Sequence, residues 1–219
     1  MSTPLLPQTF WFRLAIPCIR VDGLPRAKGR LLDLPESCRL PDTSALSGAA
    51  SWADVRAAWS PQGLAFAFEV TGKSGPITRE LVGQTAGEGI QVWIDARDTR
   101  GIHRATRFCQ RFAATIRPSK AGLAVSLAQR PIARALADPP MADLESIQSR
   151  AELIRGGWRL EIFLPNKAIH GFDPDVNRRL GLAYQVTDLE REDRFLTVGR
   201  DFPIGEDPSL WATLELVDP

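Results

Sequence analysis

Apolar and polar residues alternate with a period of two along most of the chain. Such alternation places neighbouring side chains on opposite faces of a β-strand. It predicts strands within residues 53–60, 63–72, 89–98, 122–129, 147–155, 158–164, 180–188 and 210–217, with further strands near 10–21. The apolar phase of these strands is predicted to face a common core that includes Trp59, Phe66, Phe68, Val92, Ile94, Trp158, Leu160, Ile162, Tyr184 and Val186.

Tight-turn sequences separate two pairs of these segments. Pro61 and Gly63 take the second and fourth positions of the turn after 53–60, which suits a type I turn. Gly156-Gly157 separates the strands on either side of it in a similar way. Each pair is therefore predicted to form a β-hairpin.

Helical signals are few and short. The stretch 131–147 is interrupted by Pro139-Pro140, and residues 165–169 could form a single turn. Many short strands with Pro- and Gly-containing turns predict an all-β fold: an antiparallel β-sandwich of jelly-roll or immunoglobulin-like architecture. A length of 219 residues suits one domain, 1–219, with N-terminal strands from 1–49 packed on the rest.

The charge balance narrows the possible partners. The chain has 27 Lys and Arg against 26 Asp and Glu, a net charge of +1. No global field would hold nucleic acid or an anionic membrane, so we expect neither as a partner. The oligomeric state is left open.

Cysteine usage and the N-terminus bear on the compartment. Three Cys without a CxxC pair argue against a disulfide scaffold, so Cys109 is expected to be a free thiol. Cys18 and Cys38 could still pair in an exported protein. The N-terminus lacks the basic start of a signal peptide. The sequence as written thus predicts a cytoplasmic protein, or a secreted one if a leader has been removed.

Catalytic signatures are missing from the sequence. It contains no GxSxG, P-loop, HExxH or GxGxxG motif. Glu69 and Glu161 both fall on the outward phase of strands, and two carboxylates about 5–9 Å apart could hydrolyse a glycoside. The simpler interpretation is that they hydrogen-bond a ligand or pair with arginines. We therefore expect the protein not to be an enzyme.

The segments AAWSPQGLAFAFEV, EGIQVWIDARD, GWRLEIFLP, LGLAYQVTD and LWATLELV follow one another between residues 50 and 217. Asp95 ends the strand of the second, Glu161 and Pro165 lie in the third, and Gly181 and Asp188 lie in the fourth. This succession resembles carbohydrate-binding module family 9, within the broader DOMON-like group. The resemblance implies a β-sandwich, usually non-catalytic, whose concave face binds a sugar and whose loops often carry structural calcium.

Calcium is the only cofactor that these considerations suggest. Asp95 and Asp98 lie in the ARDTRG turn, where they could hold a calcium ion together with backbone carbonyls. Capping of the turn is the alternative role for both.

The outward-facing residues of the central strands also bear on sugar binding, independently of the family resemblance. An amide- and carboxylate-rich face with one Trp suits a polyhydroxylated ligand, because planar polar groups bind vicinal hydroxyls and an indole covers a sugar ring. Alternatively, an extra segment or a second subunit covers this face, and Trp93 is packed. The residues on this phase are Glu69, Gln91, Trp93, Arg159, Glu161, Gln185 and Thr187.

The basic segment that follows residue 98 is open to two interpretations. Arg100, Arg104, Arg107 and Arg111 would form one stripe on a helix, which could bind nucleic acid or phosphate. A strand that ends in Thr115-Ile116 would instead bring Arg107 and Arg111 to the concave face. There they could line the site, pair with a glutamate, or stay solvated.

The predicted function is non-catalytic binding of carbohydrate or a related small polar molecule. The alternatives are a structural or protein-interaction domain whose polar face is covered, and a glycoside hydrolase that uses Glu69 and Glu161. The predicted ligand-binding residues are Trp93, Gln91, Glu69, Glu161, Arg107, Arg111 and Gln185.

Overall fold

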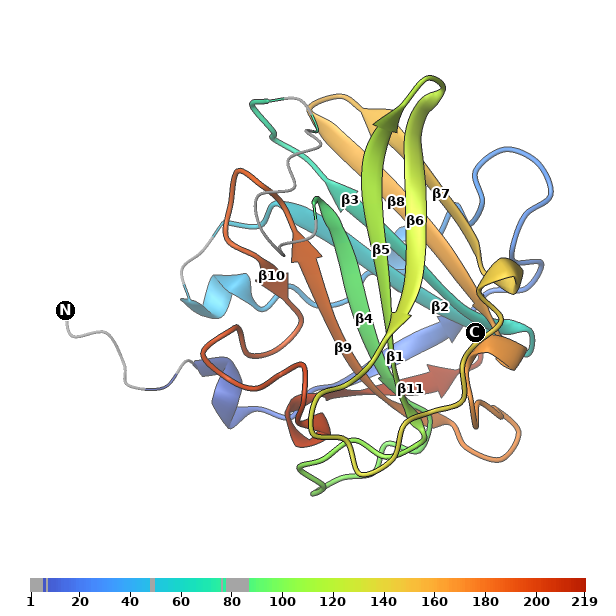
Figure 1. The fold of residues 1–219 in the computed structure, drawn as a ribbon, viewed down its shortest axis with the longest axis vertical. Coiled ribbons are helices and arrows are strands. Elements are labelled where there is room, and N and C mark those ends of the chain that lie inside the picture. Colours follow the sequence, from blue (N-terminus) through green and yellow to red (C-terminus); the bar gives the residue numbers. More distant parts are fainter. Residues whose placement is uncertain (1–5, 7, 48–49, 76, 78–86) are drawn as a thin grey trace.

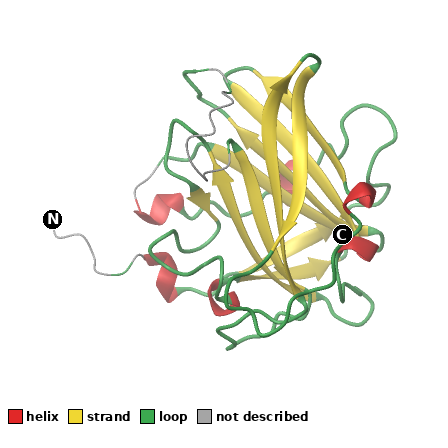
Figure 2. Cartoon of the chain, viewed as in Figure 1, coloured by secondary structure: helices red, strands yellow, loops and turns green. Residues whose placement is uncertain are grey.

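The computed structural model describes residues 6, 8–47, 50–75, 77 and 87–219 (Figure 1). Strands dominate it, which confirms the all-β prediction (Figure 2). The strands are β1 Ala15–Arg20, β2 Ala53–Ser60, β3 Gly63–Val70, β4 Gly89–Asp95, β5 Cys109–Ser119, β6 Gly122–Arg130, β7 Gln148–Ile154, β8 Gly157–Pro165, β9 Arg179–Thr187, β10 Arg194–Phe195 and β11 Ala212–Val217.

Helical structure within the described residues is confined to 3-10 turns of three or four residues. The turn expected at 165–169 is present as η5, whereas 131–147 is irregular apart from η4. Pro139-Pro140 explains this, because proline lacks the amide hydrogen that a helix interior needs. The turns are η1 Gln8–Trp11, η2 Glu36–Cys38, η3 Ser44–Ser47, η4 Leu144–Ser146, η5 Asn166–Ala168 and η6 Pro208–Leu210.

The strands form a single hydrogen-bonded sheet that is nearly closed. Their order is β6-β5-β4-β9-β11-β1-β2-β3-β8-β7, with β10 beside β9. The sheet curls until β6 and β7, at the two ends of this order, lie side by side (Figure 1). The sheet is therefore continuous through β11 and β1, where the prediction had two separate stacked sheets.

The strand pairs of the described chain are antiparallel except for those of β1. This strand runs parallel to both β11 and β2. A parallel neighbour requires a long connection, and the stretch of chain between β1 and β2 supplies it. The entirely antiparallel sheet that we expected is wrong at this position.

Both predicted hairpins are present. Ser60 pairs with Gly63, and Ile154 pairs with Gly157, so each hairpin turns through two residues. A Cβ atom on Gly63 would lie 2.1 Å from the carbonyl oxygen of Leu164, which rules out any side chain at this position. The glycine therefore allows β8 to pass close to the turn of the first hairpin.

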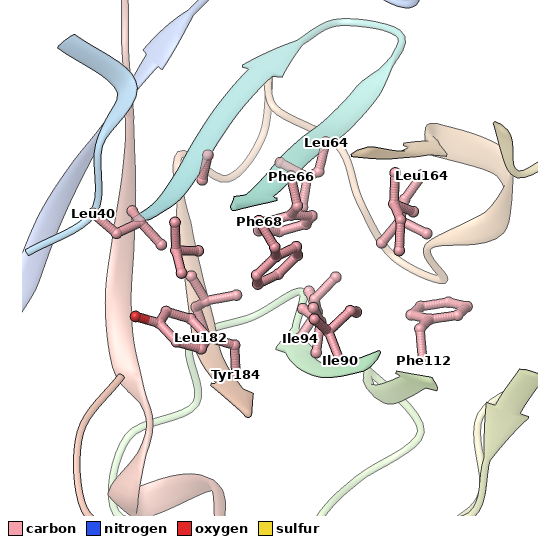
Figure 3. Close-up of a cluster of buried hydrophobic side chains, with 14 of the residues drawn as sticks. Leu40, Leu64, Phe66, Phe68, Ile90, Ile94, Phe112, Leu164, Leu182 and Tyr184 are labelled. Carbon is pink, nitrogen blue, oxygen red and sulfur yellow. The ribbon is translucent and has the colours of Figure 1, made fainter. Parts of the chain in front are cut away.

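The inner faces of the two halves pack against each other (Figure 3). All ten side chains that were assigned to the core in advance are at most 3 % exposed. Phe68 of β3 meets Tyr184 of β9 edge to face, with ring centroids 6.0 Å apart. The period-two alternation therefore identified the inner phase of β2, β3, β4, β8 and β9 correctly.

Irregular segments cover part of the outer surface of each half. On β3 and β8, the segment around Leu32 packs over Phe163. On β4 and β9, Ile132 and Ile204 from connecting segments pack over Trp93. The outward phase of the strands is thus partly buried, and this coverage determines which polar residues stay accessible.

All three cysteines are buried free thiols, as expected for Cys109. Burial raises the pKa of Cys109 to about 11, so the thiol is a poor nucleophile at neutral pH. Among the described helices, none has the length and apolar character needed to cross a membrane.

Candidate functional site

A polar hollow of about 370 Å³ opens on the outer surface of β4, β5 and β9. Its volume falls within the range of small-molecule sites, roughly 300–1,000 Å³. Three of the predicted binding residues meet here: Gln91, Arg111 and Gln185. The other described lining residues are Gly87, Gly89, Ile90, Ala113, Ala114, Thr115, Arg130, Thr187 and Arg200.

Strand register brings the three polar side chains together. Gln91 of β4 pairs directly with Gln185 of β9, and Arg111 of β5 pairs with Trp93, two residues further along β4. Residues two apart on a strand share a face, so Arg111 reaches diagonally to Gln91. Its Nε donates to Gln91 Oε1 at 2.8 Å, and its Nη2 donates to the same oxygen.

The amides continue this row of hydrogen bonds across the sheet. Gln91 Nε2 donates to Gln185 Oε1 at 3.0 Å, and Gln185 Nε2 donates to Asp193 Oδ2. Asp193 also forms an ion pair with Arg200. An arginine can only donate and a carboxylate can only accept, so the orientation of both amides is set from the two ends of the row. The polar groups are therefore held in place before any ligand arrives.

Trp93 does not provide the exposed ring that we expected. It is 2 % exposed and lies beneath Arg111, whose guanidinium carbon is 5.2 Å from the ring centroid. The connecting segment around Gly205 covers it from another side. Of the two alternatives for this residue, packing is correct and an exposed stacking surface is wrong.

The hollow is positively charged. Arg111, Arg130 and Arg200 line it, and none of the described lining residues is acidic. Burial, together with the charge of Arg130, lowers the pKa of Arg111. Arg130 and Arg200 were not among the binding residues predicted from the sequence. Arg130 lies just beyond the predicted strand 122–129, and Arg200 lies in an irregular segment, so the alternation placed neither of them on this face.

Glu69 and Glu161 lie on the opposite half of the sheet, so the expectation of one connected pocket is wrong. They line a separate cavity of about 100 Å³ on the outer surface of β3 and β8. Glu69 forms an ion pair with Arg159. Glu161 is 4 % exposed and accepts hydrogen bonds from the backbone amides of Leu31, Leu32 and Asp33 at 2.9–3.3 Å.

The arrangement of these two glutamates does not resemble a hydrolase centre. The cavity is smaller than the roughly 300 Å³ at which ligand sites begin. Both oxygens of Glu161 already accept protein hydrogen bonds, so neither is placed to attack a sugar. Glu161 instead anchors the segment that covers β8.

Asp95 and Asp98 have structural partners. Asp95 accepts hydrogen bonds from the backbone amides of Arg97 and Thr99, at 2.9 and 2.7 Å, as a turn-capping residue does. Asp98 forms ion pairs with Arg100 and Arg179. The described residues contain no group of three or more His, Cys, Asp or Glu that could hold a metal ion. These contacts do not fit the suggested calcium site.

Carboxylates do converge elsewhere, but around an ammonium group. Lys73 Nζ lies 2.5 Å from Glu88, 2.8 Å from Asp188 and 3.1 Å from Glu190. Lys73 and the first two acids are at most 3 % exposed. The cluster ties the start of β4 to the end of β9, beside the rim of the hollow at Gly87 and Gly89.

Arg107 lies away from the hollow, in the turn before β5. Its guanidinium carbon is 5.1 Å from the ring centroid of Phe108. The pairing of Arg107 or Arg111 with Glu69 or Glu161 is also wrong, because Arg159 takes that place beside Glu69.

A second hollow, of about 300 Å³, opens between β2 and β9, where Trp52 and Tyr184 line it. Its polar groups are largely engaged with one another. Arg39 forms an ion pair with Asp54, and a second arginine of the lining, Arg194, pairs with Asp42. It therefore offers fewer free donors to a ligand than the hollow on β4, β5 and β9.

The fold and the hollow together describe a curled all-β domain with a preformed polar site on its outer surface. Neither a protein-family model nor a curated protein sequence matches the chain. The fold is similar to that of a carbohydrate binding module family 9 from Caldicellulosiruptor kristjanssonii in complex with cellotriose. The identity is 13 %, the match covers 94 % of each chain, and the TM-score is 0.61.

A structure of a family 9 module from the same organism in complex with glucose is similar as well. Here the identity is 13 %, the coverage is 93 % of this chain and 96 % of the other, and the TM-score is 0.60. These structures confirm, at the level of the fold, the family resemblance carried by the strand segments.

Proposed function

We propose that this chain is a non-catalytic carbohydrate-binding domain of the β-sandwich type, with its site in the hollow of Gln91, Arg111 and Gln185. The observation that carries the proposal is the fixed row of planar polar groups at the floor of an open cavity. Carbohydrate hydroxyls both donate and accept hydrogen bonds. To bind these hydroxyls specifically, a protein needs a few polar groups at fixed positions on a largely preformed surface.

The comparisons support the ligand class. Two structures with this fold were solved with cellotriose and with glucose. Binding without hydrolysis fits a site whose described lining residues include no carboxylate that could serve as a general acid or nucleophile. Glu69 and Glu161, which a hydrolase would need, lie on the other half of the sheet and are engaged with protein groups.

A glycan array followed by calorimetric titration tests the proposal. An isolated domain without an exposed aromatic plate is expected to bind weakly, with a dissociation constant of about 10 μM to 1 mM. Gln91→Ala removes the central amide of the row and is expected to weaken binding at least about tenfold. Gln148→Ala is the matched control, because Gln148 is exposed on β7, away from the hollow.

Two further readouts make the experiment decisive. Trp93 lies under Arg111, so ligand binding should shift tryptophan emission in the native chain and not in Gln91→Ala. Reducing ends should not appear during prolonged incubation with a bound oligosaccharide. Binding of no glycan at all would contradict the proposal. Full binding by Gln91→Ala would move the site away from this hollow, and released sugar would contradict the non-catalytic role.

A further inference from the structure

The charge of the hollow points to an acidic carbohydrate as its ligand, one that carries a carboxylate or sulfate group on the sugar. This inference rests on the proposed function and specifies the substrate class of the same site. It follows from how the three arginines are placed and partnered.

Arg111 and Arg130 form a like-charge pair in the sheet. They are direct cross-strand partners on β5 and β6. Like charges at such positions destabilise a strand pair, and a carboxylate nearby would normally offset the repulsion. Neither arginine has an ion pair with a described residue: Arg111 is bonded to Gln91 and to the Pro131 carbonyl, and Arg130 is exposed. A local conflict of this kind is expected at a functional site.

The two arginines that carry this charge also have N–H groups that donate to no described residue. A guanidinium has five N–H groups, and Arg111 uses three of them on Gln91 and Pro131. Two N–H groups remain on Arg111, and all those of Arg130 stay without a described partner. Arg200 differs, because Asp193 neutralises it. The hollow therefore has an excess of two positive charges, and paired donors are suited to the two oxygens of an anionic group.

The same surface favours a sugar anion over a neutral sugar. No aromatic ring is among the described residues that line the hollow, so stacking on a sugar ring contributes little there. The hydroxyl groups of Thr115 and Thr187 and the amides of Gln91 and Gln185 supply neutral groups for sugar hydroxyls. A compact hollow of about 370 Å³ also fits one or two sugar units better than a nucleic-acid backbone, which needs an extended basic stripe.

Matched sugar pairs test this inference on the full chain. Methyl glucuronide and methyl glucoside differ only in the carboxylate at C6, and methyl galacturonide and methyl galactoside form a second pair. Glucose 6-sulfate distinguishes sulfate from carboxylate, and inorganic sulfate tests the anion alone. We expect the acidic member of a pair to bind about tenfold more tightly at low salt, through a charge-assisted hydrogen bond. The preference should shrink as salt is raised to about 0.5 M.

Arg130→Gln should remove most of this preference, measured as the ratio of the dissociation constants of the two members of each pair. Arg117→Gln is the matched control, because Arg117 is an exposed arginine of β5 that does not line the hollow. Since Arg130→Gln also removes the like-charge pair, the unliganded variant should melt at the same temperature as the native chain or slightly higher. That second readout confirms that the variant is folded.

The outcomes separate the two proposals. Equal or tighter binding of the neutral members overturns the acidic-sugar inference and leaves carbohydrate binding intact. No binding of any sugar, with or without binding of inorganic sulfate, overturns both. An acidic preference that survives both Arg130→Gln and Arg111→Gln would place the anion elsewhere and overturn the assignment to this hollow.

Discussion

The outer surfaces of the two sheet halves differ in how their charges are partnered. On β3 and β8, which we call the paired face, Arg159 bonds to both Glu69 and Glu152, and Glu161 is bound by backbone amides. On β4, β5 and β9, which we call the site face, the row that starts at Arg111 contains no acid until Asp193, at its far end. Both faces come from strands with the same alternation.

The comparison shows that the partners of the charged residues decide the role of a polar strand face. A face whose charges are paired within the protein stabilises the fold, and a face with unpaired donors can bind a ligand. The paired face closes its hydrogen bonds within the protein, so its polar residues attach a covering segment. The site face leaves donors unused, so its polar residues can serve a ligand. Substitutions on the two faces should therefore separate stability from binding.

The largest effect is expected from Trp93, which supports the site face from below. Trp93→Ala empties a fully buried site and should lower the free energy of unfolding by about 3–5 kcal/mol. Urea denaturation measures this loss. Trp93→Phe keeps an aromatic ring, and because Trp93 Nε1 has no hydrogen-bond partner, it should cost only about 1–2 kcal/mol. A small effect of Trp93→Ala would mean that the covering segments are not packed as described.

Glu161→Gln tests the paired face. The substitution replaces one carboxylate oxygen, which accepts hydrogen bonds, with an NH2 group, which donates them. This NH2 group would face the backbone N–H groups of the covering segment. We expect the free energy of unfolding to fall by about 2–4 kcal/mol, with the sugar affinity of the folded protein unchanged. Glu215→Gln, at a half-exposed position of β11, is the control and should change stability by about 0.5 kcal/mol or less. Loss of binding without loss of stability would assign Glu161 to a ligand site.

The smallest expected effect depends on pH and concerns Asp54, on the edge of the paired face. Burial acts to raise its pKa, but hydrogen bonds and charges from Arg56 and Arg39 outweigh burial and lower it. Because the folded-state pKa lies below the unfolded value of about 3.9, the stabilisation is complete above that pH. It is lost as the pH falls through the folded-state pKa.

Asp54→Asn should therefore cost about 1–2 kcal/mol at pH 7. Unfolding curves of both proteins between pH 7 and acid should converge as the pH falls. A gap that stays constant in acid would show that the ion pairs of Asp54 do not stabilise the fold.

Much of the fold could be predicted from the sequence because the two faces of a strand alternate strictly. The inner phase of residues such as Phe68, Leu160 and Tyr184 was correct, and so were both hairpins. The parallel position of β1 was not predictable, since it depends on a pairing with β11, close to the other end of the chain.

The candidate site was predictable only in part. Gln91 and Gln185 were found by their outward phase, and Arg111 by its place in the basic segment. Alternation cannot tell an open outer face from a covered one, however, because the covering segments are irregular. Trp93 has the same phase as Gln91 and is buried by residues such as Ile204, more than a hundred positions away in the chain.

The place of β1 between β11 and β2 has a consequence for synthesis. Ala15 pairs with Thr213, so this ladder joins residues that are 198 positions apart. The hairpins β2–β3, β5–β6 and β7–β8 can form as each leaves the ribosome, and one edge of β1 can pair with β2, but its other edge must wait for residues 212–217. Contacts between such distant residues form late and slowly. During translation the nascent chain therefore carries a strand near its N-terminus with one open edge, which a chaperone could bind until β11 emerges.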